Sequence, residues 1–245
     1  MAAPGLELQD LHFGRGSWQV VFDLAVPAGA FAALIGASGA GKSTLLALVG
    51  GFETPASGSI RIDGVDITGL APAQRPVTTL FQDHNLFAHL DAAQNVGLGL
   101  DPGLRLDAAQ KAKVSQALAH VGLGGMDRRL PRELSGGERQ RVALARSLVR
   151  ARPVLLLDEP FAALGPALRR DMLDLVDALR RETGITVVMV SHEPADARRV
   201  ADITAFMHEG RILAQGDTDT VLDSPDHPAL ADYLGVAPSE GSTSG

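Results

Sequence analysis

The sequence predicts an α/β fold built on a largely parallel sheet, and two observations lead to this prediction. Short apolar runs of strand length alternate along the chain with longer stretches of helical periodicity. From residue 83 to residue 152 no such run occurs, so this stretch is predicted to be helical and inserted between two strands of the sheet. The predicted strands are LELQDLHF from residue 6, QVVFDLAV from 19, FAALIG from 31, VTTLF from 77, VLLLD from 154 and ITVVMV from 185.

Composition narrows the class of protein. With 245 residues, 45% of them hydrophobic, the chain can bury a sizeable core. It has no cysteine, which excludes disulfides and thiolate chemistry. The formal net charge of −7 and the pI near 5.4 argue against nucleic acid as the main partner. Neither a signal peptide nor an apolar run long enough to span a bilayer is present, so we expect a soluble chain on the cytoplasmic side.

A phosphate-binding loop is predicted directly after the strand FAALI. The sequence GASGAGKST at 36–44 fits the pattern G-x-x-x-x-G-K-[ST] between a strand and a helix. Its glycines let backbone N–H groups point at phosphate oxygens, and the start of the helix adds its positive end. Lys42 is predicted to reach the β- and γ-phosphates of ATP, and Ser43 to bind Mg²⁺. The predicted nucleotide-binding residues are Gly36, Ala37, Ser38, Gly39, Ala40, Gly41, Lys42, Ser43 and Thr44.

Two adjacent carboxylates end the strand VLLLD. An acidic residue at the carboxyl end of a core strand can hold Mg²⁺ through water, and a second one beside it can deprotonate an attacking water. The pattern therefore predicts Asp158 as the metal residue and Glu159 as the general base. Without the phosphate loop upstream, the same pair before Pro160 would be interpreted as an ordinary polar strand end.

The stretch ELSGGERQRVALARSL contains a helix start with two properties. Ser135 and Glu138 stand in the S-x-x-E relation of a capping box, and the glycines between them leave free N–H groups that form an anion site. This stretch resembles the LSGGQ signature of the ATP-binding subunits of ABC transporters. Gln82 in TLFQDHNLF and His192 in VMVSHE agree with that family in order. Glu138 replaces the usual glutamine, and we expect its side chain to turn towards its own backbone.

The resemblance covers about residues 6–234 and implies the fold in more detail. It implies a P-loop NTPase (RecA-like) core over about 6–82 and 153–234, with an N-terminal antiparallel β subdomain. The helical subdomain that carries the signature spans about 83–152. The tail from 235 to 245 is small and polar, and we expect it to be disordered.

The resemblance also assigns site residues. In the family the signature, here Ser135, Gly136, Gly137 and Glu138, meets the γ-phosphate held by a second copy, which implies a head-to-tail homodimer. Gln82 is implied to sense Mg²⁺ and the attacking water and to couple to the membrane subunit, and His192 to contact the γ-phosphate. Phe13 lies at the position of the aromatic residue that stacks on adenine, with Trp18 as its competitor.

The substrate is predicted from resemblance alone. Residues 75–110 and the neighbouring TPASGSIRIDGVDIT resemble the ATP-binding subunits of bacterial thiamine importers. This resemblance implies an inner-membrane permease, a periplasmic solute-binding protein, and a peripheral position on the cytoplasmic face of the bacterial inner membrane. The alternatives are an importer of iron, polyamine, molybdate or an amino acid, a soluble ABC ATPase that acts on macromolecules, and a P-loop kinase of small molecules.

One position departs from the family pattern. After the carboxylate pair the family usually reads A-L-D, with its aspartate at the dimer interface, whereas this chain reads AALGP with Gly165 there. An ordered glycine loses more backbone entropy than other residues, and Pro166 favours an extended conformation at the preceding residue. We expect a working but slow ATPase whose dimer closes less readily.

Overall fold

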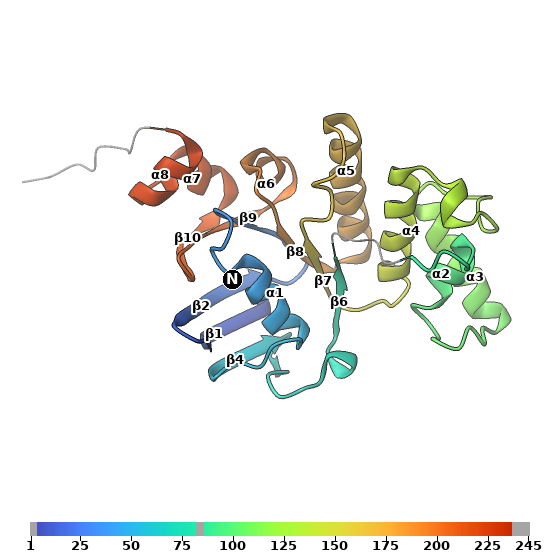
Figure 1. The fold of residues 1–245 in the computed structure, drawn as a ribbon, viewed down its shortest axis with the longest axis horizontal. Coiled ribbons are helices and arrows are strands. Elements are labelled where there is room, and N and C mark those ends of the chain that lie inside the picture. The colour runs from blue at the N-terminus through green and yellow to red at the C-terminus, as the bar shows by residue number, and fades with distance from the viewer. Residues whose placement is uncertain (1–3, 82–85, 237–245) are drawn as a thin grey trace, which may run out of the picture.

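The structure is a computed structural model that describes residues 4–81 and 86–236, and its centre is a mixed sheet of ten strands (Figure 1). The strand order is β5-β4-β1-β2-β10-β9-β3-β8-β7-β6. The strands are β1 (Pro4–Arg15), β2 (Trp18–Pro27), β3 (Phe31–Ile35), β4 (Ser57–Ile62), β5 (Val65–Asp66), β6 (Val77–Leu80), β7 (Val154–Asp158), β8 (Thr186–Val190), β9 (Ile203–His208) and β10 (Arg211–Asp217).

Helices flank this sheet and fill the long interval between β6 and β7. They are α1 (Lys42–Gly50), α2 (Ala92–Gly97), α3 (Ala108–His120), α4 (Gly136–Leu148), α5 (Pro166–Thr183), α6 (Pro194–Val200), α7 (Thr218–Asp223) and α8 (Pro228–Leu234). Two short 3₁₀ turns, Pro72–Gln74 and Pro131–Glu133, lie in connections. Within the described ranges, no helix has both the length and the apolar character needed to cross a bilayer.

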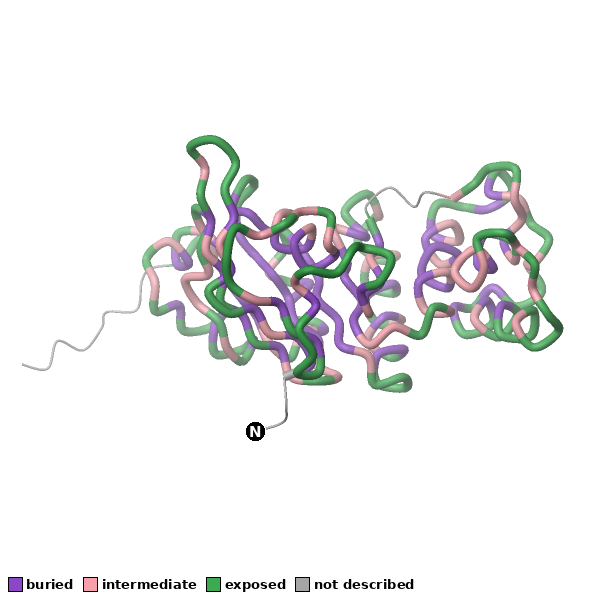
Figure 2. The backbone as a smooth tube through the Cα atoms, turned by 90° about the horizontal axis from the view of Figure 1, so that it is seen from below, coloured by how far each residue is buried: buried purple, intermediate pink, exposed green. Residues whose placement is uncertain are grey.

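The parallel part of the sheet confirms the predicted α/β fold. β3 pairs in parallel with β8 and β9, and β7 pairs in parallel with β6 and β8. Helices cover both faces, because Leu156 of β7 packs in the cluster that contains α1 whereas Leu155 and Leu157 pack in the cluster that contains α4 and α5. Strands buried on both faces need apolar residues at every position, which explains the continuous apolar run VLLL before Asp158. Figure 2 shows the buried backbone concentrated in this sheet.

The strands β1, β2, β4 and β5 form an antiparallel part of the sheet, and β9 and β10 are a further antiparallel pair. One feature of β1 decides where the ring of Phe13 lies. The β1–β2 register shifts between Leu8 and Leu11, and Asp10 inside this bulge has a φ of +45°. The bulge changes the alternation of side chains along the strand. As a result Phe13 joins Leu8 and Leu11 in the buried core.

The stretch predicted as helical contains α2, α3 and α4, which gather at one end of the molecule (Figures 1 and 2). Their apolar faces share one core with the sheet, in which Val96, Val114 and Leu144 are buried together with Leu157 of β7. The helix α4 is also tied to the loop after β7, where the Gln140 amide donates to the carbonyl of Pro160 at 3.0 Å. This contact links the helical end to the carboxylate pair that precedes Pro160.

Candidate functional site

The loop between β3 and α1 is shaped by glycines at positions that other residues could not occupy. Gly36 has a φ of +145°, and a Cβ there would lie 2.1 Å from the carbonyl oxygen of Met207 on β9. Gly41, with a φ of +103°, caps α1 without any side-chain hydrogen bond. The first N–H groups of α1 therefore have no side-chain acceptor at the cap, which is the arrangement that binds phosphate at a helix start.

Lys42, the first residue of α1, is held over this loop. Its side chain is buried, and its ammonium donates to the carbonyls of Gly36 at 2.7 Å and Ala37 at 2.9 Å. The pKa of Lys42 is lowered overall, because the effect of burial exceeds that of the nearby Glu159 and Asp158 carboxylates, which raise it. The loop thus presents one fixed positive charge beside its backbone amides.

Two oxygen ligands meet at the edge of the loop. The Ser43 hydroxyl donates to a carboxylate oxygen of Asp158 at 3.1 Å. The pKa of Asp158 is raised overall. Burial and the neighbouring charge of Glu159 raise it, and the hydrogen bond from Ser43 lowers it by less. A hydroxyl and a carboxylate side by side are the hard oxygen ligands that Mg²⁺ prefers, so these two residues fit a magnesium ion.

Glu159 and His192 come from adjacent strand ends. Asp158 at the end of β7 is paired with Val190 at the end of β8, so the residues after them lie next to each other. The His192 imidazole nitrogen Nε2 lies 2.5 Å from a Glu159 carboxylate oxygen, and both side chains line the pocket over the phosphate loop. Glu159 has a φ of +47°, a conformation rare outside glycine that marks local strain of the kind found at functional sites.

A buried polar network holds the backbone around His192. The Ser191 hydroxyl donates to the Asp196 carboxylate at 2.7 Å and accepts the backbone N–H of Glu193 at 3.0 Å. Arg169 of α5 forms an ion pair with the same carboxylate. This network joins the His192 loop to the first turns of α5 and α6. It is not evident from the sequence, because nothing in the spacing of these residues indicates that they meet.

The signature residues begin α4, which packs with α5 on one face of the sheet, whereas the phosphate loop leads into α1 on the other face. The expected capping box at Ser135 is confirmed: the Ser135 N–H donates to the Glu138 carboxylate at 2.7 Å, and the Glu138 N–H donates to the Ser135 hydroxyl at 3.3 Å. The first bond lowers the pKa of Glu138. A Cβ on Gly137 would lie 2.7 Å from the Leu168 side chain, so this glycine lets α4 approach α5 closely. Among the described residues, the signature does not line the phosphate-loop pocket of its own chain.

The aromatic residue beside the phosphate loop is Trp18, which corrects the prediction for Phe13. The Phe13 ring is 8% exposed and packed in the core, because the bulge in β1 places it there, and a buried ring cannot offer its face to adenine. Trp18, at the start of β2, lines a pocket of about 270 Å³ together with Ser38, Gly39, Gly41, Lys42, Ser43, Thr44, Glu159 and His192. Trp18 is therefore the ring whose position suits adenine stacking.

Gly165 is the cap residue at the start of α5. Its φ of −63° and ψ of 156° are extended, as the following Pro166 predicts, and no side chain caps the helix there. The residue is not buried, and a Cβ on it would meet no atom within 4 Å. The backbone therefore does not require glycine at this position. Gln82, the predicted sensor of Mg²⁺ and of the attacking water, lies outside the described residues.

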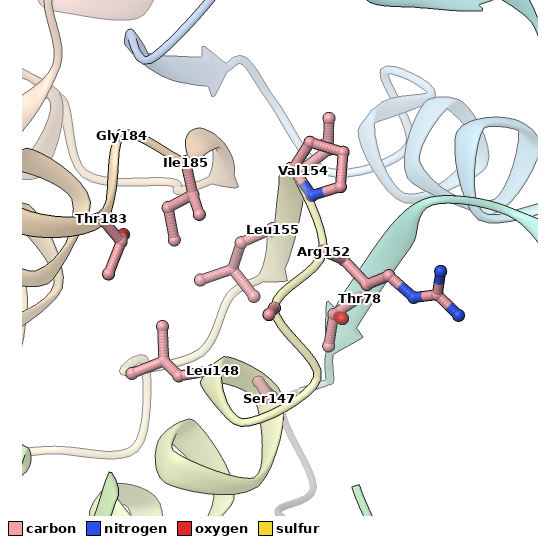
Figure 3. Close-up of a pocket in the computed structure, with 11 residues that line it drawn as sticks. Thr78, Ser147, Leu148, Arg152, Val154, Leu155, Thr183, Gly184 and Ile185 are labelled. Carbon is pink, nitrogen blue, oxygen red and sulfur yellow. The ribbon is translucent and has the colours of Figure 1, made fainter. Parts of the chain in front are cut away.

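A larger cavity, of about 340 Å³, lies at the opposite ends of the parallel strands (Figure 3). Its lining includes Thr78, Val154 and Ile185, which stand at or near the starts of β6, β7 and β8. The side chains of Leu155 and Ile185 face its interior, whereas the Arg152 guanidinium extends away from them. In the described part of the chain, no carboxylate or glycine-rich helix start lines this cavity. Ligands of parallel α/β sheets bind at the carboxyl ends of strands, so we assign the chemistry to the phosphate-loop pocket.

Comparisons with known proteins agree with this geometry. A family model described as ABC transporter matches residues 21–162. The Thiamine import ATP-binding protein ThiQ of Brucella suis is 54% identical over 96% of this chain and 97% of its own length. The proteins of the same name from Rhizobium meliloti and Chelativorans sp. are 52% and 56% identical, over 96% and 94% of this chain and 99% and 94% of their own.

Solved structures show the same fold. CbiO1 from Clostridium perfringens, part of the ABC transporter complex cbiONQ, superposes with a TM-score of 0.81 at 27% identity, covering 90% of this chain and 91% of that one. MJ1267, an ATP-binding cassette of an ABC transporter in its ADP conformation, gives a TM-score of 0.87 over 94% of this chain and 98% of its own, at 23% identity. With its phosphate loop, its carboxylate pair and these relatives, the chain belongs to the ABC transporter family and is one of its ATP-binding, ATP-hydrolysing subunits.

Proposed function

We propose that this chain hydrolyses ATP to drive the uptake of thiamine through a partner permease. One observation supports the hydrolytic role above the others: Glu159 and His192 meet at 2.5 Å over a phosphate loop whose Ser43 touches Asp158. The substrate is supported by relatives named for thiamine import that are 50% to 56% identical over nearly the whole chain.

The residues of the pocket divide the work of hydrolysis. The loop amides and Lys42 hold the phosphates, Trp18 stacks on adenine, and Ser43 and Asp158 hold Mg²⁺. Mg²⁺ held by these two residues would neutralise negative charge on the phosphates. Glu159 accepts the proton of the attacking water, and His192 contacts the γ-phosphate and orients the Glu159 carboxylate. Gln82 is proposed as a further ligand that senses Mg²⁺ and this water.

A second copy of the chain is proposed to complete each site. Ser135 and Gly136 are exposed at the start of α4, where this helix presents its positive end. Among the described residues, this helix start does not line the phosphate-loop pocket of its own chain. A head-to-tail pair with two-fold symmetry brings each signature to the phosphate loop of the other chain and produces two equivalent sites.

An exposed aromatic patch supports docking to a permease. Phe52 and Phe81 are 55% and 42% exposed, and their rings lie 5.7 Å apart edge to face. Exposed apolar side chains gathered in this way are typical of a protein–protein interface. We place the permease on this patch, with the chain peripheral to the cytoplasmic face of the inner membrane and a periplasmic solute-binding protein in the complex.

The test is transport in vesicles that contain the chain assembled with a thiamine-importer permease and its solute-binding protein. ATP-dependent accumulation of labelled thiamine or its phosphates is expected, with none for iron, polyamine, molybdate or amino acids. A Glu159→Gln complex serves as the control for hydrolysis. Uptake of one of the other solutes in place of thiamine would assign the chain to another importer, and uptake unaffected by Glu159→Gln would remove the proposed base.

A further inference from the structure

The C-terminal helix contributes a side chain to the His192 loop. Tyr233 of α8 is the single tyrosine of the chain, and its hydroxyl donates to the backbone carbonyl of His192 at 2.9 Å. The two residues are 41 positions apart, so this bond is a tertiary contact that fixes one wall of the pocket to the end of the domain. It reaches the backbone of the same residue whose imidazole lies against Glu159.

Packing fixes the position of the Tyr233 side chain. Leu230 and Ala231 anchor α8 in the core, both with 0% exposure. The Tyr233 ring packs on Phe206 of β9, with ring centres 5.4 Å apart, so both ring and hydroxyl have a defined direction. Burial raises the pKa of Tyr233, while a hydrogen bond from the backbone of Gly36 lowers it. Because the net effect is a rise, the phenol stays protonated at neutral pH and remains a hydrogen-bond donor.

The Tyr233 hydroxyl holds a residue of the proposed site. His192 is the residue proposed to contact the γ-phosphate, and its backbone carbonyl accepts the bond from the phenol. A hydroxyl that donates to this carbonyl can keep the His192 backbone at a constant distance from α8. The Ser191 and Asp196 network holds the His192 loop from a different side, through side chains of α5 and α6.

We propose that Tyr233 is a positioning residue for ATP hydrolysis, which holds the His192 backbone so that the imidazole stays beside Glu159 and the phosphate loop. The inference rests on the role of His192 under the proposed function. Tyr233 touches neither the nucleotide nor the attacking water, and it acts only through His192. The competing explanation is that its hydroxyl merely fastens α8 to the domain.

The two explanations differ in what loss of the hydroxyl changes. A fastening bond contributes to stability alone, whereas a positioning bond also changes the rate of the chemical step. Tyr233→Phe removes the hydroxyl and keeps the ring on Phe206. The matched control is Thr183→Val at the end of α5. The Thr183 hydroxyl also donates to a backbone carbonyl, that of Leu179 at 2.7 Å, and Thr183 does not line the phosphate-loop pocket.

The experiment measures kcat and KM for ATP, with the thermal midpoint of unfolding, in the assembled permease complex. A neutral hydrogen bond corresponds to about a threefold to tenfold change in rate when its loss falls on the reactive state. We expect Tyr233→Phe to lower kcat by this factor with KM changed less than about twofold. Thr183→Val should leave kcat unchanged at a comparable loss of stability.

A second readout reports on the histidine itself. The imidazole carbon–proton NMR signal of His192, assigned by its loss in His192→Gln, should shift in Tyr233→Phe and stay in place in Thr183→Val. An unchanged kcat or an unmoved His192 signal in Tyr233→Phe would overturn the inference. That result leaves the proposed function standing if His192→Gln and Glu159→Gln still stop hydrolysis. Full hydrolysis in His192→Gln would overturn the inference together with the role proposed for His192, while Glu159→Gln tests the hydrolytic function separately.

Discussion

Two glycine-rich helix starts in this molecule are built in opposite ways. At α1, the cap residue Gly41 has left-handed backbone and makes no side-chain bond, and Lys42 follows it directly. At α4, Ser135 and Glu138 close a capping box with bonds of 2.7 Å and 3.3 Å in both directions. Both starts offer backbone N–H groups and a positive helix end to an anion. Among the described residues, the α1 start lines the pocket that also contains Trp18, Glu159 and His192, and the α4 start does not.

This difference indicates which part of the proposed ATP site a single chain forms on its own. At the α1 start, a Cβ on Gly36 would overlap the Met207 carbonyl, so only glycine fits at this position of the phosphate loop. Under the proposed function, the α1 start therefore binds ATP within one chain. The α4 start is stabilised by its own capping box, and we propose that it meets a phosphate bound by a second copy. The proposal thus assigns binding to the α1 start and hydrolysis to the two starts together.

The largest effect is expected from Glu159→Gln, which leaves both helix starts intact and removes the base between them. Lys42, Ser43 and Asp158 still hold the nucleotide, so ATP affinity should stay within about twofold. Phosphate release should fall by about 10² to 10⁴, the contribution of a general base. Steady-state release in the assembled transporter measures this, and near wild-type hydrolysis would rule Glu159 out.

A smaller loss, on the α1 side only, is expected from Trp18→Ala. Stacking of a base on an aromatic ring contributes about 1 to 3 kcal/mol, so the affinity for ATP should fall about fivefold or more. Phe13→Leu is the matched control, because that ring is buried: it should lower the thermal midpoint and leave nucleotide affinity unchanged. Titration with a fluorescent ATP analogue compares the two, and the reverse order of affinities would restore Phe13 as the platform.

On the side that we propose meets the second copy, Gly165→Asp should raise ATP-driven dimerisation and turnover, by about twofold to tenfold. The extended backbone accepts any residue, and an aspartate there caps α5 and supplies a charged hydrogen-bonding group worth about 1.5 to 3 kcal/mol at most. Light scattering and phosphate release measure both quantities. Gly165→Ala isolates the entropy of the glycine from the carboxylate. If the aspartate lowers both quantities, the glycine is an adaptation of this chain.

The smallest effect is expected within the α4 start itself. Glu138→Gln should change ATPase activity less than about threefold, because either side chain completes the capping box. Glu138→Ala should cost more through loss of the cap. A strong change in the Gln variant, measured by phosphate release in the same complex, would show that the carboxylate charge acts on the nucleotide directly.

The same residue gives a pH dependence whose sign comes from its lowered pKa. The Ser135 N–H favours the ionised form of Glu138, so its pKa in the folded chain lies below the ordinary value of 4.5. The resulting stabilisation is fully present above about pH 4.5 and disappears as the pH falls through the folded-state pKa. The urea midpoints of wild type and Glu138→Gln should therefore converge in acid, and a gap that widens there would contradict this sign.

Much of the site could be predicted from the sequence, because its residues lie in short motifs. The phosphate loop, the carboxylate pair and the capping box each depend on neighbours within a few positions, so spacing alone indicates their geometry. Phe13 could not be placed in this way, because a bulge at Asp10 decides which face of β1 it occupies. Tyr233 carries no sequence signal, since its partner His192 is 41 positions away.

Part of the fold is also beyond the sequence patterns. The strands β9 and β10 are not among the predicted runs, although β9 lies next to β3 at the centre of the sheet and carries the Met207 carbonyl against Gly36. Residues such as Thr204 and His208 break the continuous apolar pattern of a central strand. Thr204 is tolerated there because its hydroxyl pairs with that of Thr218 at 2.9 Å. Pairing of this kind depends on the tertiary fold.

The most direct test compares one disrupting change at each helix start, Lys42→Ala at α1 and Ser135→Arg at α4. Nucleotide affinity is measured by titration on the isolated chain, and ATP hydrolysis in the assembled transporter. We predict that Lys42→Ala weakens affinity and thereby stops hydrolysis, whereas Ser135→Arg keeps wild-type affinity and still stops hydrolysis. Weakened affinity in Ser135→Arg equal to that of Lys42→Ala, or full hydrolysis in Ser135→Arg, would contradict the division of binding and hydrolysis between the two helix starts.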